Sequence, residues 1–354
     1  MSLNPAPPSH QSLFVRPTRP FGQRAVLERE AEFQQSGHRR RTTPLGAQST
    51  QMEDKTMRLP GEDQLRDAIL KEHGPELEVT SDLLNIGVGV FLNPVRPVAF
   101  EVGASEAVDS FELLICLGLV AKACRQFRGV VAVAEISLSD VAESNGRMLL
   151  ETMLTVEFLT RPTVTLKRNG KVLPDVSGHS LTRLLRSRLY LVHDAAGTLK
   201  TLRGMVSTGD LRSPNADHVL RVAESHVQEY SDEIGPEWTE RLKHGTTCAG
   251  VSALDLADSL GLLPIYHAFY RPASARIHAS DASRYVEVTE KAGGGLIFSA
   301  TSSMKGVAEA LMVSSLAMLD ILTAVNQRLE LRLEGQLHAI GPRIQEMTGR
   351  LPVE

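Results

Sequence analysis

The residues best suited to act on a phosphate ester lie together in one short segment, Leu263–Ser280, which reads LPIYHAFYRPASARIHAS. On a continuous α-helix, Arg271 and His278 are two turns apart less about 20°, so both side chains point the same way and Ser274 lies between them. Imidazole can act as a general acid or base near neutral pH, and a guanidinium can bind a phosphate through two hydrogen bonds. The spacing therefore predicts a catalytic set of Arg271, Ser274 and His278.

Four further side chains are predicted to support this set: Arg147, Glu151, Tyr266 and Tyr270. Arg147 and Glu151 are four residues apart in an otherwise apolar helix, so they face the same partner. We expect Glu151 to lie within reach of Arg271, with the tyrosines near the same concave surface. The alternative is a structural network, in which Arg147 and Glu151 form a surface salt bridge and His278 caps a helix end. In that network Arg271 pairs with a helix carboxylate such as Glu151.

A strongly basic stretch supplies a candidate surface for nucleic acid. Residues 161–203 contain nine Lys or Arg against two Asp, an excess that no other stretch of the folded region shows. Clustered cations attract a nucleic-acid backbone independently of its base sequence. The predicted RNA-binding residues are Lys167, Arg168, Arg183, Arg186 and Arg188. The alternative interpretation of this stretch is a solvated helix face.

The rest of the sequence excludes several common chemistries. His244 and Cys248 have the spacing of two helix-borne metal ligands, but no third ligand accompanies them, so no metal site is expected. The sequence has no Gly-x-Ser-x-Gly, no His-Glu-x-x-His and no Gly-rich dinucleotide motif. We therefore expect no nucleotide cofactor, and no cofactor of another kind. The formal net charge of -4 argues against a protein that coats DNA.

Cysteine usage and hydropathy point to a cytoplasmic protein. The three cysteines, Cys116, Cys124 and Cys248, are too few and too scattered for a disulfide framework, which favours a reducing compartment. The longest apolar runs, around 113–124 and 310–319, have roughly ten residues, whereas a membrane-spanning helix needs about 20. We therefore expect no membrane span and no secretory signal.

The fold class is predicted to be mainly α, a multi-helix bundle with two small β-hairpin insertions near 164–173 and 285–298. Leu, Ala and Val supply most of the apolar mass and only 5% of residues are aromatic, which favours helices. Asn169-Gly170 between alternating apolar residues indicates the first hairpin. Pro75 is expected to separate two helices within 61–92. Apolar periodicity and proline positions predict further helices at about 105–128, 139–161, 180–206, 215–230, 252–260 and 302–337.

Two regions differ in composition. Residues 1–60 hold seven of the 18 prolines, and nine Lys or Arg against five Asp or Glu, which is the composition of a disordered basic tail. Residues 61–354 are predicted to form a single helical domain of opposite net charge. A basic tail could contact nucleic acid or membrane, and the simpler interpretation is an extension without function.

The order of several residues resembles a bacterial and archaeal helical family catalogued as a domain of unknown function. The matching positions are Arg147, Leu150 and Glu151, then Trp238, then Ser252, Leu256, Ala257 and Leu260-Gly261, and finally Tyr266, Tyr270-Arg271, Ser274 and His278-Ala279-Ser280. The likeness covers about residues 105–330, and Tyr-Arg-x-x-Ser-x-x-x-His is its most specific part. Two features depart from the family: about 13 residues separate Trp238 from Ser252, and the Asn169-Gly170 hairpin looks like an insertion. The resemblance implies an all-α fold and no established activity.

A more distant similarity is to HEPN domains, helical bundles whose ribonuclease members carry Arg, four to six residues and then His. Arg271 and His278 have six residues between them, although Pro272 replaces the polar residue that usually follows the arginine. This resemblance implies a metal-independent endoribonuclease of stress or phage defence, with RNA as partner and the site formed across a homodimer. A non-catalytic helical interaction or scaffold module is the alternative. Exposure of His278 in a cleft would favour the enzyme, and full burial would favour the scaffold.

Overall fold

The structure is a computed structural model, and it describes residues 62–92, 108, 110–174, 181–209, 216–277, 287–290, 296–299 and 306–349. The chain divides into two units, Met1–Arg58 and Leu59–Glu354. All of the described residues belong to the second unit. The predicted basic tail, residues 1–60, lies outside the described residues.

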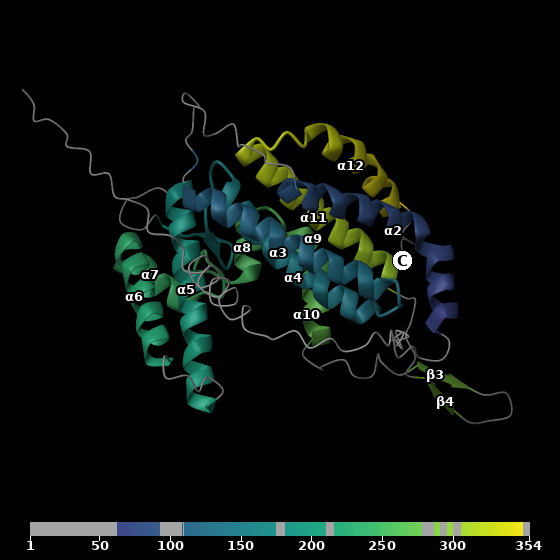
Figure 1. Ribbon diagram of the computed structural model, residues 1–354, viewed down its shortest axis with the longest axis horizontal. Coiled ribbons are helices and arrows are strands. Elements are labelled where there is room, and N and C mark those ends of the chain that lie inside the picture. Colours follow the sequence, from purple (N-terminus) through teal and green to yellow (C-terminus); the bar gives the residue numbers. More distant parts are fainter. Residues whose placement is uncertain are drawn as a thin grey trace, which may run out of the picture. The chain divides into compact units, whose positions relative to one another are not determined.

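The second unit is mainly α-helical, as the sequence predicts (Figure 1). Its first half contains α2 (Glu62–Leu92), α3 (Ser110–Ala134), α4 (Ser139–Thr160), β1 (Lys167–Arg168), β2 (Lys171–Val172) and α5 (Arg183–Thr208). The middle contains α6 (Ala216–Ile234), α7 (Pro236–His244), α8 (Ala253–Ser259), α9 (Leu263–Ile265), a π turn η3 (Tyr266–Tyr270) and α10 (Arg271–Ile277). The last part contains β3 (Glu287–Glu290), β4 (Leu296–Ser299), α11 (Val307–Leu329) and α12 (Glu334–Gly349).

Helix α4 lies in the core, where it packs on both α3 and α11 (Figure 1). Its side chains Leu149, Met153 and Val156 are fully buried, and they recur at the spacing of one helix face. Phe127 from α3 and Ile321 from α11 are fully buried as well. The helix predicted at 139–161 is therefore confirmed, and it forms the base on which the candidate site is built.

A glycine in α4 lets two neighbouring segments approach its backbone. A Cβ atom at Gly146 would lie 2.8 Å from the Ser314 Oγ of α11 and 3.2 Å from ring carbons of Phe269 in η3. A larger residue would have to push one of these neighbours away. The close contact seats the π turn, which also carries Tyr270, directly on α4.

Both hairpins lie where the sequence predicts them, and β3 pairs with β4 in the second. In the first, Asn169 and Gly170 have left-handed φ values of 51° and 73°, as a tight two-residue turn requires. Arg168 pairs with Lys171 across this turn. The tip is fixed to α8, because Asp255 Oδ1 accepts a hydrogen bond of 2.8 Å from the Asn169 N–H.

The expected end of one helix near 128 is wrong, since α3 runs to Ala134, and two further boundaries change how the helices are divided. Pro75 does not separate two helices, because it lies inside α2, which changes direction along its length (Figure 1). A proline removes one backbone hydrogen bond and can bend a helix without ending it. The last long helix does not reach Leu337, because α11 ends at Leu329 and Glu330 adopts a left-handed φ of 52°. A separate helix, α12, then begins at Glu334.

Helix α11 is long and apolar enough to cross a membrane, the one such helix in the part of the chain that the structure describes. Its most apolar window is 61% buried inside the protein. The helix packs on α2, α3, α4 and α12. This degree of burial is typical of a core helix.

All three cysteines, Cys116, Cys124 and Cys248, are free and buried. Burial raises the pKa of Cys116 and that of Cys248 to about 12. Burial also raises the pKa of Cys124, to about 11. The three thiols therefore stay protonated in the folded protein.

Candidate functional site

The predicted catalytic segment folds as one helical run with a π turn between α9 and α10. Within η3 the Arg271 N–H donates to the carbonyl of Tyr266, five residues back. Pro272 comes two residues after the last residue of the π turn and lacks an N–H, so one backbone hydrogen bond of this continuous run is missing at that point. The run then continues through Ile277. π turns are rare in proteins as a whole and occur often at functional sites, so this turn is a mark of a functional segment.

A three-membered polar network joins the π turn to α4. Arg147 Nη2 donates to Glu151 Oε1 at 3.0 Å and to the Tyr270 hydroxyl oxygen at 3.1 Å. The Tyr270 hydroxyl donates to the same Glu151 oxygen at 2.6 Å. The Arg147 guanidinium also lies 4.9 Å from the centroid of the Tyr270 ring. The pairing of Arg147 with Glu151 is thus confirmed, but the second partner of the Glu151 carboxylate is Tyr270, whereas the sequence interpretation expected Arg271.

Burial and this network keep the Tyr270 hydroxyl protonated. Burial, and next the hydrogen bond to Glu151, raise the pKa of Tyr270 to about 12. Burial also raises the pKa of Tyr266, whose ring stacks on that of Tyr270 with 4.7 Å between centroids. The charges of Arg271 and Arg147 oppose the rise at Tyr266, so both cations lie near its hydroxyl. Stacked aromatic rings and cations therefore occupy one region.

The predicted catalytic residues are described in part. The Arg271 side chain is exposed, and in the described part of the chain it makes no hydrogen bond or ion pair. Ser274, one turn further along α10, is half-buried. His278 lies outside the described residues. The choice between enzyme and scaffold that depends on the exposure of His278 therefore stays a prediction. Since α10 is unbroken to Ile277, the helical spacing that relates Arg271 to Ser274 is confirmed.

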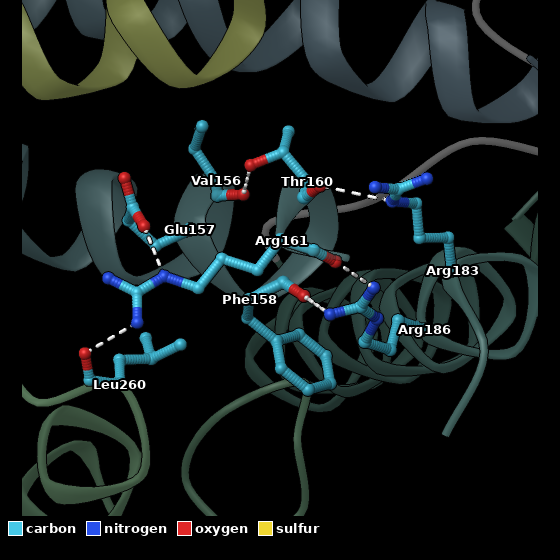
Figure 2. A network of polar contacts seen from close by, with 8 residues as sticks. All are labelled: Val156, Glu157, Phe158, Thr160, Arg161, Arg183, Arg186 and Leu260. Carbon is cyan, nitrogen blue, oxygen red and sulfur yellow. Dashed lines mark hydrogen bonds and ion pairs between the residues drawn. The ribbon is translucent and has the colours of Figure 1, made fainter. Parts of the chain in front are cut away.

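Arg186, predicted to bind RNA, is fully buried at the end of α4 (Figure 2). Its Nη1 donates to the Phe158 carbonyl at 2.7 Å, and its Nη2 donates to the carbonyl of Arg161. Carbonyls at a helix C-terminus lack partners within the helix and carry its partial negative charge. Arg186 therefore stabilises the end of α4, and it offers no surface to an RNA strand. Burial lowers the pKa of Arg186 to about 10.

Two further arginines bind at the same helix end (Figure 2). Arg183 Nε donates to the carbonyl of Thr160 at 3.1 Å. Arg161 Nε donates to Glu157 at 2.5 Å, and its Nη1 donates to the carbonyl of Leu260 at 2.6 Å. These bonds tie α5, and the residue that follows α8, to the C-terminus of α4. Three arginines of the basic stretch, Arg161, Arg183 and Arg186, therefore stabilise contacts between helices.

The remaining predicted RNA-binding residues differ in how their charge is compensated. Lys167 Nζ forms an ion pair of 3.0 Å with Asp258, and Arg188 Nε forms one of 2.9 Å with Glu233. Arg168 donates to a backbone carbonyl, and it has no carboxylate partner among residues 62–92, 110–174 and the other described ranges. Of the five predicted residues, Arg168 is the exposed one that keeps an uncompensated charge.

Sequence reasoning missed Arg241 and Trp238 as a pair. The Arg241 guanidinium carbon lies 4.6 Å from the centroid of the Trp238 ring. The Arg241 side chain also contacts Gly250, whose carbonyl accepts the hydrogen bond from Arg168. Both residues lie in α7, which has equal numbers of acidic residues and of Lys or Arg, so the local composition did not indicate a binding surface. The three-residue spacing of Trp and Arg on one helix face was the available signal.

Sequence comparison places the chain in one family of proteins. A family of unknown function (DUF5677) matches residues 113–294, a span that includes α4, the π turn and α10. The match covers more than half of the chain, which therefore belongs to this family. A search of the curated proteins and a search of the solved structures found no match. The resemblance to a domain of unknown function is thus confirmed, and the activity has to be argued from the site.

Proposed function

We propose that this protein binds single-stranded RNA and cleaves it without a metal ion, with Arg271 binding the phosphate and His278 transferring the proton. The observation that supports this is the exposed Arg271, which directly follows Tyr270 and whose charge acts on Tyr266, in a segment where the rings of Tyr266 and Tyr270 stack. Proteins hold single strands by pairing cations with phosphates and by stacking bases on aromatic rings. Tyr266 is the more exposed of the two rings and is the expected platform for a base.

The proposed cleavage is an internal transesterification of RNA. The ribose 2′-oxygen forms a bond to the adjacent phosphorus and the bond from phosphorus to O5′ breaks, which leaves a 2′,3′-cyclic phosphate and a 5′-hydroxyl. One group must accept the 2′-hydroxyl proton and another must protonate O5′. His278 fills one of these roles, and a homodimer would bring a second His278 for the other. Arg271 stabilises the charge on the phosphoryl oxygens, and Ser274 donates to the same phosphate.

The test is incubation of the purified full-length protein with RNA in the presence of EDTA. General acid–base catalysis contributes about 10² to 10⁴ in rate, so His278→Ala should lose at least two decades of activity while the fold is retained. Arg271→Ala should also lose most activity. The exposed His267, on the preceding turn, is the matched control, and His267→Ala should cleave like the wild type. No cleavage by the wild type, or equal cleavage by all four proteins, would overturn the proposal.

The biological setting follows from the chemistry. A cytoplasmic protein with this activity would act on cellular or phage RNA, which agrees with the HEPN-like role in stress or phage defence. Free, buried cysteines are consistent with a reducing compartment. Expression of the wild type and of His278→Ala in the same cells should therefore differ in toxicity, with the variant better tolerated.

A helical interaction module is the second candidate, and the half-covered face of α6 favours it. This helix packs on α5 and α7, and its apolar stripe is only partly covered; the stripe consists of Val219, Leu220, Ala223, Val227 and Tyr230. Arg188 and Arg203 of α5 already form ion pairs with Glu233 and Glu224 of α6 in the same chain, so the feature that α6 leaves for a partner is its apolar stripe. Light scattering tests this face: a dimer that Val227→Glu turns into a monomer supports α6 as the interface. A wild-type monomer, or a dimer that the substitution leaves intact, overturns it.

A further inference from the structure

Two arginines from different elements meet at one backbone position outside the proposed catalytic set. Arg168 ends β1, and its Nη2 donates to the Gly250 carbonyl at 3.0 Å. Arg241 belongs to α7 and passes so close to the same glycine that a Cβ there would lie 2.8 Å from Arg241 Cγ. Gly250 thus fixes both side chains, one by a hydrogen bond and the other by contact.

Neither guanidinium is neutralised by an ion pair within the described ranges. Arg241 lies over the Trp238 ring and donates to the Pro174 carbonyl at the long distance of 3.5 Å. Burial lowers the pKa of Arg241 and the positive charge of Arg168 lowers it further, while the charge of Glu237, one turn earlier in α7, opposes both without an ion pair to Arg241 in the described ranges. Lys167, the neighbour of Arg168 in β1, has its own carboxylate at 3.0 Å in Asp258. Like charges held together are unfavourable until an anion binds them both.

The loop of residues 245–251, which contacts both arginines, is closed by its own backbone contacts. A Cβ at Gly245 would lie 2.3 Å from the Gly250 carbonyl carbon, so the two glycines are in direct backbone contact. Gly250 has a left-handed φ of 70°. The Val251 carbonyl accepts the N–H groups of Thr246 and Thr247, both at 3.2 Å. The carbonyl that fixes Arg168 therefore belongs to a preorganised turn, which lowers the entropy cost of binding a ligand.

This arginine pair is connected to the proposed RNA site through α8. The residue after Arg168 is Asn169, whose N–H donates to Asp255 of α8 at 2.8 Å. The charge of Asp255 acts on Tyr266, the half-buried ring of the proposed site. Asp255 is itself engaged, since its Oδ2 accepts from the Ser252 hydroxyl at 2.7 Å. Asp255 of α8 thus bonds to the hairpin tip and acts on Tyr266, so the proposed strand would run from Tyr266 over α8 toward Arg168.

We propose that Arg168 and Arg241 form a phosphate-binding subsite that holds a backbone phosphodiester of the same single strand. This inference rests on the proposed RNA-binding function and extends it to a second position along the strand. Each guanidinium can donate to a non-bridging oxygen of the phosphate, so one phosphate can reduce the repulsion between the two positive charges. The subsite explains why a basic hairpin tip is fixed to the folded core.

The experiment measures binding of a 2′-O-methyl oligoribonucleotide, which cannot undergo cleavage through the 2′-hydroxyl. The double variant Arg168→Gln with Arg241→Gln should bind about ten-fold more weakly than the wild type. Loss of one phosphate contact should also reduce the slope of log K against log salt by about 0.7. Arg343→Gln is the matched control, because Arg343 pairs with Asp82 at 2.6 Å and Glu78 at 3.2 Å and should not affect binding.

A second arm separates an RNA phosphate from a free anion. Inorganic phosphate is compared with chloride at equal ionic strength, and thermal unfolding is recorded for the wild type and the double variant. Stabilisation of the wild type by phosphate alone, with no oligonucleotide binding, would show a small-anion site and overturn the strand subsite. If the double variant does not fold, Arg168→Gln alone takes its place. Arg168 is exposed on a hairpin, so this single variant should fold, and it should bind the oligonucleotide about three-fold more weakly than the wild type.

The outcomes separate this inference from the proposed cleavage. Oligonucleotide binding that the double variant loses, without cleavage of RNA by the wild type, supports the subsite and overturns the ribonuclease. Cleavage of RNA with equal binding by the double variant and Arg343→Gln supports the ribonuclease and overturns the subsite. A wild type that binds neither the oligonucleotide nor phosphate overturns the subsite as well.

Discussion

The Tyr270 hydroxyl donates a hydrogen bond of 2.6 Å to Glu151 Oε1, across 119 residues of sequence. This bond joins the π turn to α4, and Arg147 bonds to both partners. The carboxylate of Glu151 is therefore committed to the anchoring of the π turn. Because Glu151 bonds to Tyr270 and Arg147, it does not pair with Arg271, and the Arg271 guanidinium can bind an anionic ligand.

Removal of the Tyr270 hydroxyl tests this anchoring. Tyr270→Phe keeps the ring that stacks on Tyr266 and loses the bonds to Glu151 and Arg147. We expect the free energy of unfolding in urea to fall by about 1–2 kcal/mol. Tyr266→Phe is the control and should cost close to nothing, because the Tyr266 hydroxyl makes no hydrogen bond within the described residues. Equal losses in the two variants would show that the network does not anchor the turn.

Replacement of the buried Arg186 should be among the most damaging changes in the bundle. Arg186→Met keeps an unbranched stem in the core but leaves the Phe158 and Arg161 carbonyls without donors. We expect a loss of about 2–4 kcal/mol in the free energy of unfolding. Arg183→Met, which removes a bond to one carbonyl from a partly exposed side chain, should cost about 1 kcal/mol. If Arg186→Met unfolds at the wild-type urea concentration, the capping role is wrong.

Stability should depend on the titration of Asp320 in α11. Burial, and next the charge of Glu157, raise the pKa of Asp320 to about 6. A raised pKa means that the folded state prefers the protonated acid, so this stability is present below about pH 4 and is lost as pH rises through 6. Asp320→Asn should therefore raise the free energy of unfolding by about 1–2 kcal/mol at pH 7 and leave it unchanged near pH 4.

The matched control for this pH dependence is Asp258→Asn. Asp258 forms an ion pair with Lys167, so its loss should lower stability at pH 7 by a few tenths of a kcal/mol. The two substitutions should therefore act with opposite signs at neutral pH. A destabilised Asp320→Asn at pH 7 would mean that the carboxylate is stabilised by its surroundings.

The end of α11 offers a stabilising substitution. Glu330 holds a left-handed φ of 52°, a conformation that costs residues with a Cβ roughly 1–2 kcal/mol. Glu330→Gly should relieve this strain and raise stability by about 0.5–1 kcal/mol after the extra entropy of glycine is counted. Gln327→Gly, on the exposed face inside the same helix, should lower stability by about 1 kcal/mol. Thermal unfolding of the two variants should shift in opposite directions.

The features of the fold that could be predicted are those that depend on local chemistry. Asn169-Gly170 requires only a tight turn, and Ser252 caps α8 through the hydrogen bond that it accepts from the Asp255 N–H. The end of α11 could not be predicted, because Glu330 adopts a glycine-like conformation without being glycine. Pro75 was predicted to separate two helices because a proline often ends a helix. In the structure α2 continues through Pro75, supported by its packing on other helices.

The candidate site was predictable where helical spacing alone decided the contact. Arg147 and Glu151 meet because they are four residues apart on α4. The partnership of Glu151 with Tyr270 depends on a π turn, which rotates the following residues relative to an α-helix and leaves no mark in the sequence. Arg186 and Arg168 look alike in the sequence, and one is fully buried while the other is exposed. That difference arises from how α5 crosses the end of α4.

The burial of every native thiol makes this chain ready for site-specific labelling. Cys116, Cys124 and Cys248 account for all three cysteines of the sequence, and a maleimide needs an accessible thiolate that none of them supplies. A single cysteine introduced at the exposed Arg221 of α6 would therefore take a probe without removal of the native ones. Energy transfer between two such labelled chains would report their association directly, with the core untouched.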